Sequence, residues 1–339
     1  MLFRNLAVES VCYELPPNSV SSTALEERLH EAITRLKLPP HAIEPLTGIA
    51  ERRFWDQGTP VHTVATRVAR RAIAEAGVSP GQIGVLINTS VCKDFLEPSM
   101  ASLVHGDLGL AANCNNFDIS NACLGFLNGI EVAGRMIESG QVDYALVVDA
   151  ESAGEIVEAT VGRLLQSKAT VKDFWDSFAT LTLGSGAVAM VLANARVSRT
   201  THRVNGSVSL ADTSQNRLCL GTADRMVTDS ARLLKAGVAL ALRTWGLAAR
   251  TIPRWLESGI DQYICHQVGK PHLVALCQAL GIDLAKCFLS YPAFGNIGPA
   301  AVPLTLALAE EAGRVRPGNH VALMGVGSGL NVSMMSVTW

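Results

Sequence analysis

The sequence predicts an α/β protein built from two similar halves, and three observations support this fold class. Short apolar stretches of strand length alternate with longer stretches of helical length, which is typical of layered strand and helix units. A segment that includes Cys123 recurs, without its cysteine, around Asn296. The chain of 339 residues has room for two halves of about 170 residues each. The alternation also predicts mostly parallel sheets covered by helices.

The internal repeat shows in matched spacings. Three residue types follow both Cys123 and Asn296 at the same spacings of 15, 17 and 19 positions. These residues are Glu138, Gly140 and Val142 in the first copy, and Glu311, Gly313 and Val315 in the second. Each copy then enters an apolar strand, at 143–148 and at 320–325.

Earlier elements of the two halves pair as well. The strand expected at 82–90 resembles the one at 261–267, and the first half then holds about five extra residues before its next matched element. Residues 94–98 are the natural candidate for this insertion. We therefore predict an N-terminal half over 1–200 and a C-terminal half over 201–339, related by a pseudo-twofold axis.

Cys123 lies where a strand, a tight turn and a helix are expected to follow one another, over residues 117–126. The positive end of a helix favours thiolate over thiol, which is the setting of a nucleophile. The helix after it carries Gly125, Gly129 and Ala133 at four-residue spacing, which permits close backbone approach on one face. We predict that Cys123 is the nucleophile.

His266 and Asn296 are the candidates in the second half. His266 ends an expected strand, where its imidazole could exchange a proton with a thiol or donate to a substrate carbonyl. Asn296 lies in a turn-rich entry to a helix, where its uncharged amide could stabilise an enolate oxygen. The pseudo-twofold relation predicts that Cys123, His266 and Asn296 meet.

Two further segments carry chemistry. The glycine-rich stretch 325–330 is not a dinucleotide site, because only nine residues follow Leu330, too few for the helix, strand and acidic residue that such a site needs. We interpret it as a tight turn whose backbone N–H groups face the active site. Glu97 lies on the inserted segment, where it could act as a base, with Asp94 as the fallback.

The composition of the chain argues against nucleic-acid-binding, membrane-spanning, secreted and metal-binding proteins. A net charge of −2 gives no basic footprint for nucleic acid, and no apolar window is long enough for a membrane span. The N-terminus lacks a signal-peptide pattern, so we predict a cytoplasmic protein. The eight cysteines form no C-x-x-C pair and the eight histidines no ligand-spaced cluster, so we predict reduced thiols and no metal.

These motifs resemble those of the thiolase superfamily, and within it the β-ketoacyl synthase III group. The matching segments are 46–53 (T-G-I-x-x-R-R), 121–126 (A-C-x-G-F), 266–267 (H-Q), 295–296 (G-N) and 327–330 (the closing glycine turn). The resemblance spans nearly the whole chain. It implies a thiolase fold of five α-β-α-β-α layers, a homodimer and a covalent acyl-cysteine, with no metal or redox cofactor.

Departures from the group narrow the resemblance to one branch. The asparagine expected after His266-Gln267 is replaced by Gly269, and the arginine that usually precedes T-G-I is Leu46. Segments 86–99 and 295–300 resemble the acyl-CoA condensing enzymes of bacterial long-chain olefin synthesis. In that branch two fatty acyl-CoA molecules join head to head, and the glutamate corresponding to Glu97 serves as base. Reductase, β-lactone synthetase and decarboxylase partners are implied by this resemblance.

The implied mechanism assigns a role to each residue. Cys123 is acylated by a long-chain acyl-CoA, with the backbone N–H groups of Cys123 and Ser328 as the oxyanion hole. Glu97 then removes an α-proton from the second acyl-CoA, and His266 and Asn296 stabilise the enolate. Desolvation in an apolar pocket is expected to raise the pKa of Glu97 toward neutrality.

Other functions compete with this one. A decarboxylative β-ketoacyl synthase III would use a malonyl carrier protein and would not need Glu97. A degradative thiolase would need a second catalytic cysteine near the glycine turn, where Ser328 and Asn331 stand. A non-catalytic subunit would normally have lost the nucleophile.

Overall fold

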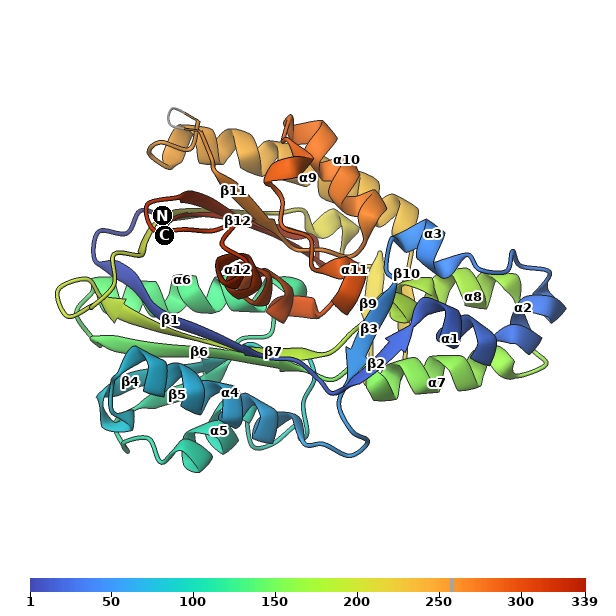
Figure 1. Cartoon of the computed structure of the whole chain (residues 1–339), viewed down its shortest axis with the longest axis horizontal. Helices are drawn as coiled ribbons and strands as arrows, with labels where there is room; N and C mark the ends of the chain where they lie inside the picture. Colours follow the sequence, from blue (N-terminus) through green and yellow to red (C-terminus); the bar gives the residue numbers. More distant parts are fainter. Residues whose placement is uncertain (257–258) are drawn as a thin grey trace.

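A computed structural model describes residues 1–256 and 259–339 of the chain (Figure 1). Nine strands of the described residues form one mixed sheet in the order β11-β12-β13-β8-β1-β7-β6-β4-β5. Their bounds are β1 (Leu6–Glu14), β4 (Ile83–Asn88), β5 (Asn115–Asp118), β6 (Tyr144–Glu151), β7 (Gly186–Asn194), β8 (Arg203–Ala211), β11 (Gln262–Cys265), β12 (His320–Gly327) and β13 (Asn331–Thr338).

The sheet is folded back on itself, so that its two parts face each other across a layer of helices (Figure 1). That central layer holds α6 (Gly125–Glu138) and α12 (Ala301–Glu311), whose apolar residues share one core with both parts of the sheet. Helices α4 (Val61–Ala76) and α5 (Met100–Leu108) cover one outer face. Helices α9 (Ser230–Thr251) and α10 (Lys270–Leu280) cover the other. The expected five-layered thiolase fold is confirmed.

The two halves repeat the same strand arrangement. The order β4-β6-β7-β1 in the first half corresponds to β11-β12-β13-β8 in the second. In each series the first pair is parallel and the next two are antiparallel. The halves join where Ala7 of β1 pairs with Arg203 of β8. The predicted division after residue 200 falls between β7 and β8, and the division itself stays a prediction.

The prediction of mostly parallel sheets is wrong. Among the described strands, parallel pairing is limited to β4 with β5 and β6, and to β11 with β12, where helices intervene along the chain. β12 and β13 are joined by the short turn 328–330, and such a connection allows only antiparallel pairing. Strand and helix alternation in the sequence did not reveal the long antiparallel strands β7, β1, β8 and β13.

A further group of elements extends beyond the layers, at the right of Figure 1. It has its own apolar core around residues such as Leu25 and Phe174. The elements are β2 (Asn18–Ser21), α1 (Ser22–Arg28), α2 (His30–Leu36), α3 (Ile43–Thr47), β3 (Glu51–Phe54), α7 (Gly154–Leu165), α8 (Val171–Ser177), β9 (Cys219–Gly221) and β10 (Met226–Thr228). The short helix α11 (Tyr291–Phe294) leads from the second half toward Asn296.

The glycine stripe of α6 explains how closely this helix approaches the sheet. A Cβ atom on Gly125 would lie 2.8 Å from the Thr89 carbonyl oxygen, and one on Gly129 would lie 2.8 Å from Cγ1 of Val147. Both distances are too short for a real contact, so only glycine allows this packing. The close approach brings the start of α6 against the ends of β4 and β6. No described helix is long and apolar enough to cross a membrane.

Candidate active site

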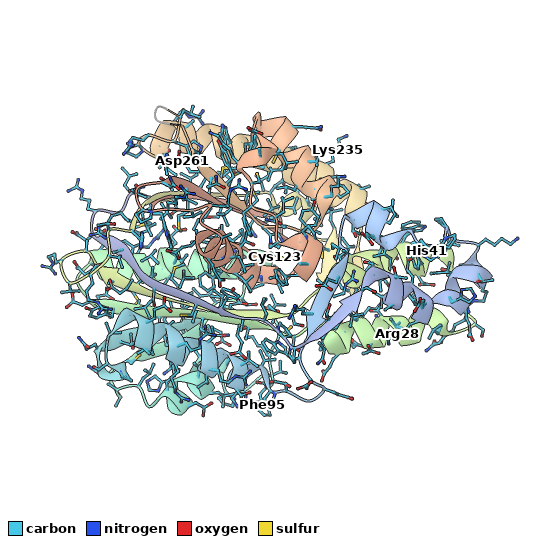
Figure 2. All side chains as sticks on the ribbon, viewed as in Figure 1. Arg28, His41, Phe95, Cys123, Lys235 and Asp261 are labelled. Carbon is cyan, nitrogen blue, oxygen red and sulfur yellow. The ribbon has the colours of Figure 1, made fainter. Side chains whose placement is uncertain are left out.

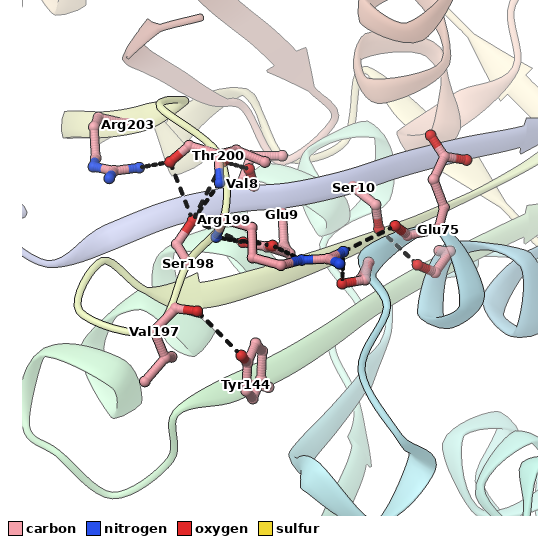
Figure 3. Close-up of polar contacts among 12 residues, drawn as sticks. Val8, Glu9, Ser10, Glu75, Tyr144, Val197, Ser198, Arg199, Thr200 and Arg203 are labelled. Carbon is pink, nitrogen blue, oxygen red and sulfur yellow. Dashed lines mark hydrogen bonds and ion pairs between the residues drawn. The ribbon is translucent and has the colours of Figure 1, made fainter.

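Cys123 lies at the junction that the sequence predicted. β5 ends at Asp118, a short 3-10 helix (η2, Ala122–Leu124) follows, and α6 begins at Gly125. Ala122 has a φ of 45°, which is a strained backbone conformation for a residue with a side chain. Such strain before a nucleophile is stored only where the surrounding structure holds it. Figure 2 places Cys123 near the middle of the view, where the central helices lie.

The glycine-rich end of β12 packs directly against the nucleophile loop. A Cβ atom on Gly327 would lie 3.5 Å from the backbone nitrogen of Cys123. At the start of β13, just after the turn, Asn331 donates through Nδ2 to Oδ1 of Asn121 at 3.3 Å. Asn121 in turn donates to Oδ1 of Asn128 at 2.6 Å. These bonds attach the turn that contains Ser328 to the loop of Cys123, and the oxyanion hole formed by the backbone N–H groups of these two residues stays a prediction.

Burial keeps the Cys123 thiol protonated in the unliganded site. Burial, with smaller contributions from the neighbouring Cys219 and Glu151, raises the pKa of this thiol to about 12. The sequence-based expectation that the helix end would favour the thiolate is therefore wrong for this state, because desolvation outweighs the helix field. A base must accept the thiol proton as the sulfur attacks.

His266 is available to accept that proton because its ring is neutral, although burial makes it a weak base. It directly follows β11, and its backbone N–H donates to the Met324 carbonyl at 2.7 Å. The side chain is 8% exposed, and neither ring nitrogen has a hydrogen-bond partner among the described residues. Burial, assisted by His272, lowers the pKa of His266 to about 4, so the ring is neutral near pH 7. A neutral imidazole has one acceptor and one donor nitrogen.

Asn296 is held by its backbone. Its N–H donates to the Thr182 carbonyl at 2.8 Å, and its carbonyl accepts from the Gly184 N–H at 2.9 Å. Its side-chain oxygen accepts from the Gly298 N–H at 3.1 Å, so the amide NH₂ is the group that can donate to a substrate oxygen. Asn296 is buried at the entry to α12.

Gln267 links the two candidate residues of the second half. Its Nε2 donates to the Phe288 carbonyl at 2.7 Å, and its Oε1 accepts from the Ser290 N–H at 2.9 Å. It therefore holds the chain that leads through α11 to Asn296 against the strand end that carries His266. The 3-10 helix η6 (Gly298–Ala300), just beyond Asn296, contacts η2. The segments that carry Cys123, His266 and Asn296 thus lie next to one another at the same end of the central layer, and the meeting of the three side chains stays a prediction.

Glu97 does not lie in this interior. It belongs to the connection 89–99 between β4 and α5, whose counterpart after β11 is only 266–269, and its side chain is exposed. Figure 2 places the nearby Phe95 at the edge of the molecule, well away from Cys123. The desolvated position expected for Glu97 is not found in the single chain, because the insertion projects outward. Its role as base stays a prediction.

Asp94, the alternative candidate for the base, is bonded to the start of α4. Its Oδ1 accepts from the Val61 N–H at 2.7 Å, and its Oδ2 accepts from the His62 N–H at 2.8 Å. His62 Nδ1 also lies 2.7 Å from Oδ2. Asp94 therefore caps the start of α4, where a carboxylate is favoured by the free N–H groups and the helix dipole.

Two buried acidic residues lie beside the site, and the sequence analysis did not predict them. Asp149 and Glu151 lie at the end of β6 and are almost fully buried. Asp149 accepts from the Thr89 hydroxyl at 2.6 Å, and Glu151 accepts from the Val91 N–H at 2.6 Å. The available signal was a pair of acids at alternate positions ending an apolar strand, which places both on one face of a buried sheet.

The same motifs are found in known proteins. Residues 117–212 match the family model "3-Oxoacyl-[acyl-carrier-protein (ACP)] synthase III", and residues 253–339 match the model of its C-terminal part. The Acyl-CoA:acyl-CoA alkyltransferase of Xanthomonas campestris is 42% identical over 339 residues, with both chains covered in full. The enzyme of the same name from Shewanella oneidensis is 38% identical over 353 residues, again with full coverage of both.

The chain belongs to the acyl-CoA:acyl-CoA alkyltransferase (OleA) family. A crystal structure of Xanthomonas campestris OleA with a substituted histidine superposes with a TM-score of 0.97, at 42% identity and full coverage of both chains. Another structure of that enzyme, with serine in place of a cysteine, contains bound lauric acid and lauroyl-CoA and has the same TM-score, identity and coverage. The protein is therefore an acyltransferase of the thiolase superfamily.

No group of three or more His, Cys, Asp and Glu side chains in the described part of this OleA-family chain is arranged to hold a metal ion. The eight cysteines are free thiols. Neither finding tests the prediction that the enzyme needs no metal or redox cofactor, which stays a prediction.

Proposed function

We propose that this enzyme joins two long-chain acyl-CoA molecules by a non-decarboxylative Claisen condensation that passes through an acyl-Cys123 intermediate. The observation that carries this proposal is the 42% sequence identity, over the full length of both chains, to the acyl-CoA:acyl-CoA alkyltransferase of Xanthomonas campestris. The clustering of Cys123, His266 and Asn296 supports it. The product is a 2-alkyl-3-ketoacyl compound.

In the first step Cys123 attacks the thioester carbonyl of one acyl-CoA. The thiol proton passes to the neutral imidazole of His266 and then to the departing coenzyme A thiolate. The backbone N–H groups of Cys123 and Ser328 receive the developing oxyanion. Losing one such donor typically costs about 3 to 4 kcal/mol in the barrier. The covalent intermediate divides a difficult transfer into two easier ones.

The second step needs a carbon nucleophile. An acyl-CoA has no carboxylate to lose, so a base must remove its α-proton, and Glu97 is the proposed base. The N–H groups of His266 and Asn296 stabilise the enolate oxygen. The α-carbon then attacks the acyl-Cys123 carbonyl, and the thiol is regenerated. Both steps conserve the oxidation level, so they balance without a redox cofactor.

The exposure of Glu97 supports the proposed homodimer. A carboxylate in water is too weak a base for an α-carbon, so the segment around Glu97 must be enclosed before it can act. Its neighbours are apolar and outward-facing, with Leu96 96% exposed, Phe95 53% and Val91 52%. Such a cluster is typical of an interface. A second copy of the chain would cover it and bring Glu97 out of water.

The product suggests what acts next. Hydrolysis of the product's thioester by water releases the second coenzyme A and leaves a 2-alkyl-3-keto acid. Such an acid readily loses carbon dioxide, so transfer to downstream enzymes would preserve it. Reductase, β-lactone synthetase and decarboxylase partners are proposed on the family resemblance, and a cytoplasmic location is part of the same proposal.

The test supplies the purified enzyme with one long-chain acyl-CoA and no malonyl donor. Release of coenzyme A is followed together with mass spectrometry of the extract. We expect a keto acid, or a ketone with twice the acyl chain length less one carbon. Release that stops at about one coenzyme A per active site, with product only after malonyl addition, would establish a decarboxylative synthase instead.

A further inference from the structure

The carboxylate of Glu151 occupies a position between two parts of the active site. One side of it accepts backbone N–H bonds from the start of the segment 89–99, at 2.6 Å from Val91 and 3.3 Å from Cys92. The other side faces the turn after Asn296, because a Cβ atom on Gly298 would lie 3.6 Å from Cδ of Glu151. The Gly298 N–H is the donor that fixes the Asn296 side chain.

We propose that Glu151 is a positioning residue that ties the Glu97-bearing segment to the Asn296 turn. Its carboxylate holds the segment at Val91 and Cys92, its third and fourth residues, so the direction in which the segment leaves the core is set there. The same carboxylate supports the turn that aims the Asn296 amide. This inference rests on the proposed function, because it assigns Glu151 to the condensation step that uses Glu97 and Asn296.

The rest of the Glu151 environment is built to hold this acid in place. The indole N–H of Trp55 donates to the Glu151 backbone carbonyl at 3.0 Å. Asp149 is held by the Thr89 hydroxyl, while its other oxygen, Oδ1, is buried without a hydrogen-bond partner in the described residues. An orphaned buried oxygen is costly, and a proton shared between the two acids satisfies it. Purely structural packing would favour apolar side chains here.

Three ionisable groups face Glu151: Asp149 on β6, Cys92 on the segment and Cys123 on η2. Burial raises the pKa of Glu151 to about 7, and it raises that of Asp149 well above the usual range, assisted by Glu151. The carboxylate that accepts both N–H bonds is therefore formed within the neutral range. A protonated Glu151 loses acceptor strength toward one of them, so the anchoring weakens as the pH falls below 7.

The test separates the two half-reactions in Glu151→Gln. Glutamine keeps the shape but turns an NH₂ group toward backbone donors, so one of the two bonds is lost. We expect acylation of Cys123, measured as the coenzyme A burst, to stay within about threefold of the wild type. Condensation should fall about tenfold or more, and the acid limb of its pH profile near pH 7 should disappear.

Two controls sharpen the result. Glu155→Gln removes an exposed acid four residues along and should leave both half-reactions unchanged. Hydrogen exchange gives a readout independent of activity, since amides of 91–99 should exchange faster in Glu151→Gln. Should that variant fail to fold, Glu151→Asp keeps the charge but cannot reach both N–H groups, and it should condense at an intermediate rate.

Two outcomes would overturn the positioning role. One is a Glu151→Gln enzyme that condenses at the wild-type rate, and the other is an equal loss of acylation and condensation, which indicates general damage. Failure of the proposed function is distinguishable, since the wild type itself would then give no product from acyl-CoA alone.

Discussion

Nδ2 of Asn331 lies 3.3 Å from Oδ1 of Asn121, which joins the turn after β12 to the residue two positions before the nucleophile. This contact crosses from the second half of the chain to the first. It holds Ser328 and Cys123, the two predicted oxyanion donors, on segments that cannot move apart while the bond lasts.

Removing this contact should slow acylation. In Asn331→Ala the turn that contains Ser328 loses its bond to Asn121. A backbone donor that is misplaced by a fraction of an ångström stabilises the oxyanion much less, so we expect the acylation rate to fall about tenfold. The measurement is the pre-steady-state release of coenzyme A. Asn18→Ala, which removes an exposed side chain bonded to Asp56, is the control and should acylate normally. An unchanged rate in Asn331→Ala would remove the turn from the oxyanion hole.

The nucleophile can be tested against its neighbouring thiol. Cys123→Ser should give no acyl-enzyme, because a hydroxyl is a far weaker nucleophile in this site. Cys219→Ser changes the thiol that helps raise the pKa of Cys123 and should still acylate. Intact-protein mass spectrometry after incubation with acyl-CoA distinguishes the two. Acyl mass on the Cys123 variant would reassign the nucleophile.

The base can be tested within the proposed dimer. Glu97→Gln should acylate Cys123 but form no condensation product, since the acceptor of the α-proton is gone. Co-expressed Cys123→Ser and Glu97→Gln chains, separated by different tags, give mixed dimers. Activity in the mixed dimer but in neither homodimer would show that Glu97 serves the partner's nucleophile. Wild-type condensation by Glu97→Gln would end its assignment as base.

Two buried groups should shape stability in opposite directions with pH. The pKa of His266 is lowered from 6.5 to about 4, so its contribution to stability is present above pH 6.5 and is lost as the pH falls toward 4. The pKa of Glu151 is raised from 4.5 to about 7, so its contribution is present below pH 4.5 and is lost as the pH rises toward 7.

Two single-residue variants should therefore show opposite pH dependences of the free energy of unfolding between pH 4.5 and 6.5. His266→Asn removes the contribution of His266 titration and should lose stability as the pH rises through this range. Glu151→Gln removes the contribution of Glu151 titration and should lose stability more steeply than the wild type as the pH falls. Urea unfolding at several pH values measures both, and parallel curves for the two variants would contradict the assignment.

The close packing of α6 can be tested with two glycines. Gly129→Ala places a methyl group 2.8 Å from Cγ1 of Val147, and we expect a loss of about 1 to 3 kcal/mol in the free energy of unfolding. Gly162→Ala in α7 meets nothing within 4 Å and should stabilise by about 0.5 to 1 kcal/mol. Denaturant unfolding compares them. Equal effects would mean that α6 does not need its glycine.

The sequence by itself determined the local elements and their order. Matched spacings after Cys123 and Asn296 identified the duplication, because an element's length and period are properties of a continuous segment. The apolar pattern of 261–267 placed His266 at a strand end, and that of 117–126 placed Cys123 before a helix; both placements are confirmed.

Only the tertiary structure decided the antiparallel pairing of β7, β1, β8 and β13, and the environment of each ionisable group. Cys123 is protonated, His266 is neutral and Glu151 is a buried anchor because segments distant in sequence exclude water from them. Glu97 is exposed because none of the residues that the structure describes covers the insertion. The exposure of a side chain to water depends on all the segments that pack around it, so a local sequence pattern cannot predict it.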